Sequence, residues 1–171
     1  KRGTIVCPPK IDQSFTQRIN SFDSEMHQKG HTSQTQVLAF YKEPASDEVK
    51  RVLRCEYVFK LVRLRSIDDT PNVFVTTYMP YELFSHFETI DFAIDSFYEQ
   101  CKRSGHPITS ITRHLEVAAA DETLADLLQV QVGSPLFYFH SYGYDDKGIP
   151  IEYSISKYRG DTNSFTFHLA Q

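Results

Sequence analysis

The segment EYVFKLVRLRSIDDTPNVFVTTYM occupies residues 56–79 and decides the fold prediction. Residues 56–65 are rich in β-branched and aromatic side chains, and residues 72–79 repeat that pattern. Between them, DDTP at 68–71 has the composition of a turn. Two strand-like runs joined in this way predict an antiparallel hairpin with a loop longer than two residues.

The rest of the chain contains further predicted helices and strands. Helical spacing or capping residues predict helices at 14–30, at 46–54, at 90–105 and after Asp121, which is the N-cap of the last one. The first helix has Ser14 as its N-cap and ends at Gly30. One further helical turn is predicted after Pro80. Further strands are predicted at 35–43, 108–117, 135–144, 149–160 and 164–169. This order predicts an α+β fold, with an antiparallel sheet of six or seven mostly sequential strands and helices packed on it.

Composition excludes several classes of protein. The 171 residues suffice for one domain, and 18 basic against 22 acidic side chains give a net charge of −4, which argues against a general nucleic-acid-binding surface. No apolar stretch approaches the roughly 18 residues of a membrane span, and no secretion signal is visible. Nucleotide-binding, zinc-protease and nucleophile-elbow motifs are all absent.

Cysteine and histidine give no sign of a metal, a cofactor or a catalytic thiol. The seven histidines are scattered without a ligand spacing. The three cysteines lie far apart and form no CxxC pair, as expected of reduced structural thiols: Cys7, Cys55 and Cys101. We therefore expect no bound metal and no cofactor.

Arg63 and Arg65 are two residues apart on a predicted strand, so both point to the same face. Two adjacent guanidinium forks suit a phosphate or a carboxylate, which each can grip with two hydrogen bonds. The alternative is a pair that faces water or bonds to carboxylates across the sheet. Pattern alone leaves both interpretations open.

The segment EYSISKYR, residues 152–159, carries a second unusual face. Glu152, Ser154, Ser156 and Tyr158 alternate along the predicted strand and share one side. A carboxylate, two hydroxyls and a phenol are typical either of a solvated face or of a polar ligand pocket. Ser96, near the start of the predicted helix at 90–105, is a further candidate, either as an anion contact or as an exposed helical serine.

Four motifs together resemble the effector-binding UTRA domain of GntR-type transcriptional regulators of the HutC subfamily. They are VRLRSIDDTPNVFVTTYMPYELF (62–84), DSFYEQCKRSG (95–105), the block from LEVAAADETLADLL to GIPIEYS (115–154) and YRGDTNSFTFHL (158–169). Each is modestly specific alone, but their order and spacing are highly specific. The resemblance covers about residues 14–171.

The resemblance implies a fold like chorismate lyase, a small-molecule pocket beside the sheet, a homodimer and a preceding winged helix-turn-helix domain that binds operator DNA. It implies an anionic effector, with sugar phosphates favoured, and a cytoplasmic protein. The positions that match the family's site are Arg63, Arg65, Ser96, Glu152, Tyr158 and Phe22. The strand pattern at 152–159 adds Ser154, and Thr77 on the return strand could donate a hydroxyl. Where the family often has an acidic residue on the return strand, this chain reads Val75-Thr76-Thr77.

The segment KRGTIVCPPK, residues 1–10, resembles the last strand of a wing followed by a proline linker. We therefore expect residues 1–10 to be the end of a DNA-binding domain and residues 11–171 to be the effector-binding domain. Two alternatives remain. One is an enzyme resembling chorismate lyase that acts on a small carboxylate, with Glu152 as general acid, and the other is a dimerisation module without a ligand.

Overall fold

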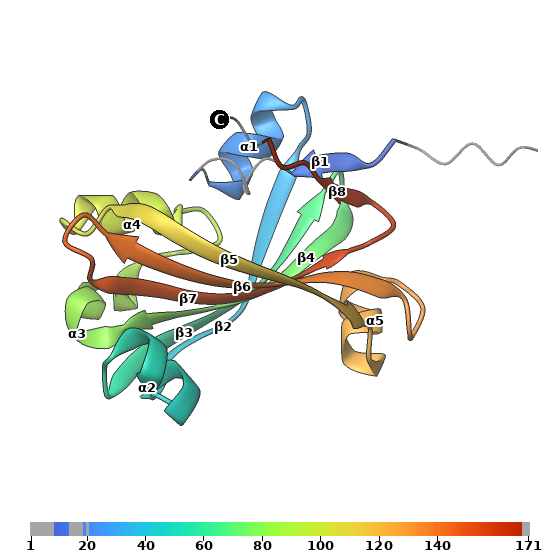
Figure 1. Ribbon diagram of the computed structural model, residues 1–171. Helices are drawn as coiled ribbons and strands as arrows, with labels where there is room; N and C mark the ends of the chain where they lie inside the picture. Colours follow the sequence, from blue (N-terminus) through green and yellow to red (C-terminus); the bar gives the residue numbers. More distant parts are fainter. Residues whose placement is uncertain (1–8, 14–18, 20, 169–171) are drawn as a thin grey trace, which may run out of the picture.

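The computed structural model describes residues 9–13, 19 and 21–168, and its centre is one six-stranded sheet (Figure 1). Every pair of neighbouring strands is antiparallel. In spatial order the strands are β2 (Ser33–Pro44), β3 (Tyr57–Ile67), β4 (Thr70–Pro80), β7 (Pro150–Arg159), β6 (Pro135–Asp145) and β5 (Ile108–Ala119). The predicted α+β class and the predicted hairpin at 56–79 are confirmed.

One pairing departs from sequence order. β4 pairs with β7, not with β5, so the last long strand enters the middle of the sheet. β5, β6 and β7 still follow one another as a meander. Consequently the predicted Arg-bearing strand and the predicted polar strand are separated only by β4.

A small second sheet lies above the large one in Figure 1. In it β1 (Ile11–Gln13) runs parallel to β8 (Asn163–Phe165), two segments from opposite ends of the chain. β8 is shorter than the strand predicted at 164–169, whose last residue lies outside the described part. β1 was not predicted, because three residues are too few to show an alternation.

Five short α-helices and one 3-10 helix cover the two faces of the sheet in the described ranges. They are α1 (Phe22–Gln28), α2 (Asp47–Leu53), α3 (Tyr81–Phe84), the 3-10 helix η2 (Ser85–Thr89), α4 (Phe97–Arg103) and α5 (Glu122–Leu128). Figure 1 shows α1, α4 and the small sheet on one face, and α2 and α5 on the other. No helix in the described residues is long and apolar enough to span a membrane.

Each face buries its own apolar clusters. On the outer face, α2 packs through Val49 and Leu53 against Val58 and Tyr153, while α5 covers a separate group that includes Leu136. On the inner face, one cluster holds α4 and α3 against the ends of β3 and β4, and a second holds α1 against the other end of the sheet. Burying a large apolar side chain contributes about 1.5–3 kcal/mol. The middle of the inner face, between its two clusters, is where polar side chains are buried.

Two helix predictions were wrong at their starts. The helix predicted at 14–30 begins at Phe22: Ile19 is not helical, and the hydroxyl of the extended residue Ser21 accepts from Ser24 N. The proposed cap Ser14 lies outside the described residues. The helix predicted at 90–105 begins at Phe97, because residues 91–94 form a separate turn in which the Asp91 carboxylate accepts from Ala93 N at 2.9 Å.

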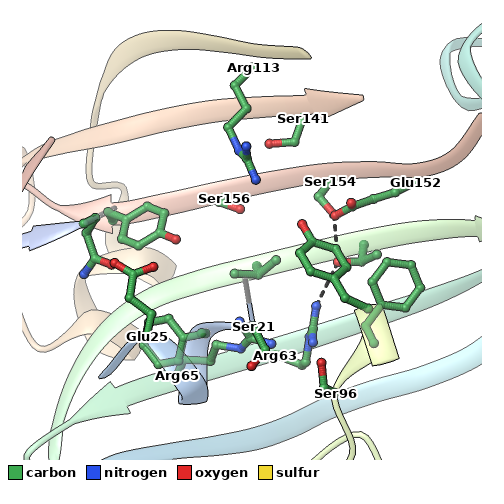
Figure 2. Close-up of a pocket in the computed structure, with 17 residues that line it drawn as sticks. Ser21, Glu25, Arg63, Arg65, Ser96, Arg113, Ser141, Glu152, Ser154 and Ser156 are labelled. Atoms are coloured by element: carbon green, nitrogen blue, oxygen red, sulfur yellow. Dashed lines mark hydrogen bonds between the residues drawn. The ribbon is translucent and has the colours of Figure 1, made fainter. Parts of the chain in front are cut away.

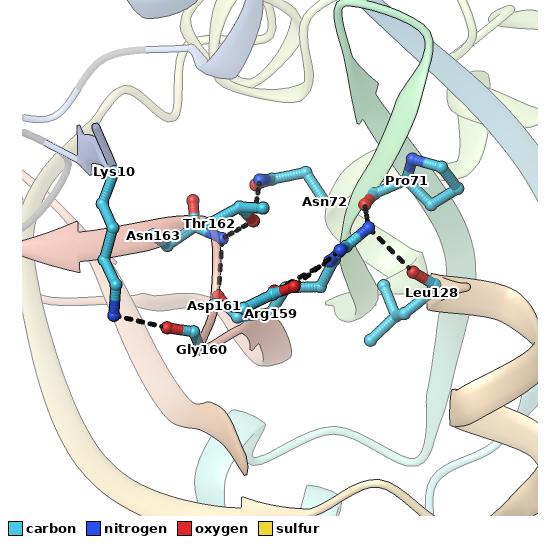
Figure 3. Close-up of polar contacts among 9 residues, drawn as sticks. All are labelled: Lys10, Pro71, Asn72, Leu128, Arg159, Gly160, Asp161, Thr162 and Asn163. Atoms are coloured by element: carbon cyan, nitrogen blue, oxygen red, sulfur yellow. Dashed lines mark hydrogen bonds and ion pairs between the residues drawn. The ribbon is translucent and has the colours of Figure 1, made fainter. Parts of the chain in front are cut away.

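A polar network ties the end of β7 to distant parts of the chain (Figure 3). Arg159 Nη1 donates to the backbone carbonyls of Pro71 and Leu128, each at 3.3 Å, while its Nε and Nη2 donate to Asp161 at 3.0 and 2.7 Å. Asn163 Nδ2 donates to Arg159 O at 2.8 Å and Asn163 Oδ1 accepts from Gln13 Nε2 at 2.8 Å. One guanidinium therefore links β7 to the start of β4 and to the end of α5, and Asn163 adds a contact to β1.

Removing Arg159 should test this network. We expect Arg159→Ala to lower the free energy of unfolding by about 1–3 kcal/mol, because it strips two part-buried carbonyls of a donor. The matched variant Asp161→Ala removes the exposed ion pair but leaves both carbonyl contacts of Arg159 in place, and it should cost under about 1 kcal/mol. Urea unfolding measures both. Equal losses in the two variants would contradict a structural role for the carbonyl contacts.

Candidate functional site

A cavity of about 70 Å³ lies on the inner face of the sheet, beneath α1, β1 and the start of α4 (Figure 2). One buried water needs about 10–15 Å³ of such a cavity, so the volume suffices for a phosphate group and part of the molecule that carries it. All eight residues that were singled out as site candidates line this cavity: Phe22, Arg63, Arg65, Thr77, Ser96, Glu152, Ser154 and Tyr158.

The alternation of side chains along the strands explains why these residues meet. Thr77 on β4 lies opposite Ser154 on β7, which lies opposite Ser141 on β6 and, through it, Arg113 on β5. Directly opposed residues in antiparallel strands point to the same face. Polar side chains two residues apart on β3 and on β7, joined through Thr77 on β4, therefore form one polar band that continues to Ser141 and Arg113. The solvated interpretation of Glu152, Ser154 and Ser156 was wrong, because all three are buried.

The two arginines of β3 form one wall of the cavity. Arg63 is 4% exposed, and Arg65 lies with its guanidinium 5.0 Å from the centre of the Phe22 ring. Neither Nε has a hydrogen-bond partner among the described residues, and no carboxylate of those residues forms an ion pair with either side chain. The alternative of a water-facing or carboxylate-bound pair was therefore wrong. Burial and the charge of Arg65 lower the pKa of Arg63 to about 9, so Arg63 remains charged at neutral pH.

A chain of hydrogen bonds joins Arg63 to Glu152 (Figure 2). Arg63 Nη2 donates to Thr77 Oγ1 at 3.0 Å, the Thr77 and Ser154 hydroxyl oxygens are 2.9 Å apart, and Ser154 Oγ donates to Glu152 Oε1. Arginine only donates and a carboxylate only accepts. While Glu152 is ionised, the single hydrogen of Ser154 therefore points to Glu152, and the Thr77 hydroxyl supplies the hydrogen between the two hydroxyls. Both hydroxyls are fixed in direction.

Two buried acids line the cavity, Glu25 on α1 and Glu152 on β7, and Glu152 belongs to the polar band. Its Oε2 has no hydrogen-bond partner among the described residues, while Oε1 accepts from Ser154. Burial raises the pKa of Glu152 above its ordinary value, against the opposing effects of Ser154, Arg113, Arg63 and the phenol of Tyr98. Gly143 on β6 leaves room for this carboxyl, since a Cβ there would lie 3.1 Å from Glu152 Oε2. No group of three or more His, Cys, Asp and Glu in the described ranges could hold a metal ion.

Ser96 sits at the rim of the cavity as the N-cap of α4, one residue before the helix and not inside it. Its hydroxyl accepts from Glu99 N at 3.5 Å, a long hydrogen bond. Two residues further on, Tyr98 also lines the cavity, and burial raises the pKa of its phenol above the ordinary value. The phenol therefore stays neutral and can both donate and accept.

Several cavity residues were missed from the sequence. The most important are Gln13, Glu25, Tyr98, Arg113 and Ser141. Arg113 and Ser141 occupy inward positions of β5 and β6, so the alternation of those strands contained the necessary signal once the pairing was known. Gln13 and Glu25 come from β1 and α1, whose placement over the sheet no local pattern reveals.

An antiparallel sheet with a buried, arginine-lined cavity on one face defines a small-molecule-binding α+β domain. The family model of the UTRA domain matches residues 28–163. The chain therefore belongs to the UTRA domain family. Related domains of this family are the effector-binding domains of GntR-family transcriptional regulators.

Two curated relatives are helix-turn-helix repressors. NagR of Bacillus subtilis is 28% identical over 177 residues, which cover 98% of this chain and 70% of NagR. PhnF of Mycolicibacterium smegmatis is 28% identical over 170 residues, which cover 96% of this chain and 68% of PhnF. A third relative, a regulator of Mycobacterium tuberculosis, is covered over 63% of its length. The chain thus spans about two thirds of these regulators.

Solved structures support the fold. The effector domain of PhnF from Mycobacterium smegmatis superposes with a TM-score of 0.83 at 23% identity, covering 88% of this chain and 95% of that one. The structure of PhnF itself gives a TM-score of 0.90 at 24% identity, covering 99% of this chain and 77% of PhnF. At these identities the likeness concerns the fold.

The raised pKa of Glu152 predicts a pH dependence of stability in the ligand-free protein. A carboxyl whose folded pKa lies above the unfolded one contributes stability below the unfolded pKa and loses it as pH rises through the folded pKa. As pH rises from 4.5 to 7.5, the melting temperature of Glu152→Gln should therefore increase relative to that of wild type. Glu99→Gln, on the exposed side of α4, is the control and should follow wild type. Parallel profiles for all three proteins would contradict a destabilising buried charge.

Proposed function

We propose that this chain is the sensing domain of a HutC-type regulator, in which the cavity binds a small anionic metabolite, with phosphorylated sugars favoured. The observation that carries the proposal is the pair of arginines on β3, whose Nε atoms are buried without a hydrogen-bond partner among the described residues. Burying an unpaired charge is costly unless something compensates it. A bound anion would accept from both guanidinium groups and relieve that cost.

The polar band beside the arginines suits the rest of such a metabolite. Ser96 at the rim, Ser154 and Ser156 on β7 and the phenol of Tyr158 all line the cavity. Burial raises the pKa of Tyr158 to about 12, so this phenol is neutral at physiological pH and can donate or accept. The unpartnered Glu152 Oε2 could accept from a ligand hydroxyl. An anionic group joined to hydroxyl-bearing carbons matches this order of groups.

The remaining parts of the proposal concern the whole regulator. We propose that residues 1–10 end a winged helix-turn-helix domain, that residues 11–171 form the sensor, and that the protein works in the cytoplasm. The helix-turn-helix names of NagR and PhnF support this arrangement. Effector binding would then change operator affinity only if the two conformations of the regulator bind the effector differently.

Homodimerisation is part of the same proposal. β5 is an edge strand of 12 residues, and Val117 on it is 76% exposed. A long, open edge strand with exposed apolar side chains is suited to pairing with another chain. We expect light scattering after gel filtration to give twice the chain mass, and Val117→Lys to shift the population toward monomer. A monomer at all concentrations in wild type would contradict this part of the proposal.

The chain is proposed to have no catalytic role. The relatives NagR and PhnF are named repressors, which supports this proposal, whereas the competing enzyme hypothesis relies on Glu152 as an acid. Incubation with chorismate provides the test, and turnover by the purified chain that is lost in Glu152→Gln would favour the enzyme.

Replacing Arg63 tests the anion site. Calorimetry with glucose 6-phosphate and glycerol 3-phosphate should show Arg63→Gln binding at least about tenfold more weakly than wild type, because a charge-assisted hydrogen bond contributes about 1.5–3 kcal/mol. Arg51→Gln is the control, since Arg51 is exposed on α2 across the sheet from the cavity. Unchanged affinity in Arg63→Gln would overturn the assignment of the site.

A further inference from the structure

The strand β5 ends the large sheet with an open edge. Among the described residues only β6 pairs with it, so alternate N–H and C=O groups of β5 point away from the sheet. On the inner face, where the cavity lies, Leu115 stands opposite the buried residue Phe139 of an inner cluster. Both Leu115 and Val117 are nevertheless exposed. Apolar side chains beside unpaired backbone groups suit a further strand.

The outer face of the same stretch carries two groups that can attract each other. His114 and Glu116 are both exposed, and His114 Nε2 lies 3.6 Å from Glu116 Oε1. On the neighbouring strand, His140 Nε2 lies 3.9 Å from Glu116 Oε2, and Tyr138 stands opposite Glu116 in register. An imidazole can donate to a carboxylate whether its ring is neutral or protonated. The edge therefore offers a donor and an acceptor two residues apart.

Symmetry limits how this edge could meet a second copy of itself. Two sheets joined edge to edge by antiparallel strands are related by a two-fold axis perpendicular to the sheet. Such an axis keeps the inner faces of both copies on one side. Each residue of β5 can therefore stand opposite only a residue of its own face, and every allowed register is centred on a single residue that meets its own copy.

The charges select one of these registers. When the register is centred on Leu115, His114 stands opposite Glu116 of the partner subunit, and the same contact occurs a second time through the axis. Opposite charges directly across a strand pair stabilise the pair, and like charges destabilise it. Centres at Arg113 or Glu116 would bring like charges face to face, and a centre at His114 would leave Glu116 opposite the partner's Thr112.

We propose that two copies of this chain pair through β5 in the antiparallel register centred on Leu115, with two reciprocal contacts between His114 and Glu116. The inference rests on homodimerisation in the proposed function and deepens it by assigning the register and the charge pairs. The two six-stranded sheets become one, with both cavities on the same face. Val117 of the partner subunit then stands opposite Arg113, which lines the cavity, so the partner borders the effector site.

Charge reversal tests the two contacts. His114→Glu places an acid opposite Glu116 of the partner subunit, and Glu116→Lys places a cation opposite the partner's His114. Since the two-fold axis repeats each change, either variant alone should dimerise at least about tenfold more weakly than wild type in analytical ultracentrifugation. An equimolar mixture should recover the dimer, because the introduced acid of one chain then faces the introduced cation of the other. Such recovery also shows that both variants fold.

The control for charge reversal is Arg51→Glu. Arg51 is exposed on α2, far from β5 in the strand order, and this variant should dimerise as wild type does.

Cysteine cross-linking tests the register independently. In a background of Cys7→Ser and Cys55→Ser, Leu115→Cys should form a disulfide between subunits under mild oxidation, because the Cα atoms of opposed residues lie about 4.5–5.5 Å apart. Val117→Cys should form none, because the register displaces the two copies of this residue by four positions, about 14 Å along the strands.

The outcomes separate the register from the dimer itself. A wild-type dimer that charge reversal does not weaken, or that cross-links through Val117→Cys and not through Leu115→Cys, would overturn the register and leave homodimerisation standing. A wild-type chain that is monomeric at all concentrations would overturn both. Neither result alters the calorimetric test of Arg63→Gln, which measures the anion site alone.

Discussion

The burial of positive charge on β3 is the constraint on which the site depends. Arg63 and Arg65 are two residues apart on an interior strand, so the pleat turns both guanidinium groups inward. An apolar cover over that face would leave these charges without compensation. The inner face therefore has its apolar clusters toward its two ends and its polar band between them.

The strand order places hydroxyl groups and a carboxyl group beside those arginines. Because β4 pairs with β7, the hydroxyls of Thr77 and Ser154 stand between Arg63 and Glu152, and the hydrogen-bond chain runs from a pure donor to a pure acceptor. Such a chain fixes the direction of both hydroxyls and couples the state of Glu152 to the arginine wall. β6 and β5 then extend the same polar row to Ser141 and Arg113. The site is thus a property of the sheet, with α1, β1 and α4 as its cover.

Much of this arrangement could be predicted from the sequence, and the failures have physical causes. Alternation along 56–79 and 149–160 gave the strands and the faces of their polar residues, because a period of two is set by the backbone itself. The resemblance added Phe22, and the structure shows that this side chain both packs in an apolar cluster and lines the cavity. The role of these residues in binding stays a prediction.

The pairing of β4 with β7 could not be predicted, since it joins residues about 80 positions apart for which no local signal exists. Arg113 was missed for that reason: one arginine in ITRHLEV has no neighbour of its own kind, and only the sheet order brings it to the cavity. The late start of α4 was missed because the spacing of apolar residues predicts a helix there, whereas the Asp91 side chain stabilises a separate turn.

The central claim, that the buried β3 arginines receive an anion, can be tested most directly by NMR of the arginine Nε–H groups. In the free domain the Nε–H signals of Arg63 and Arg65 should lack the downfield shift of a strong acceptor. Saturation with a phosphorylated probe should move both signals downfield and slow their exchange with water, while Arg51 stays unchanged. Probe binding that leaves both signals in place, with shifts elsewhere in the domain, would contradict the account.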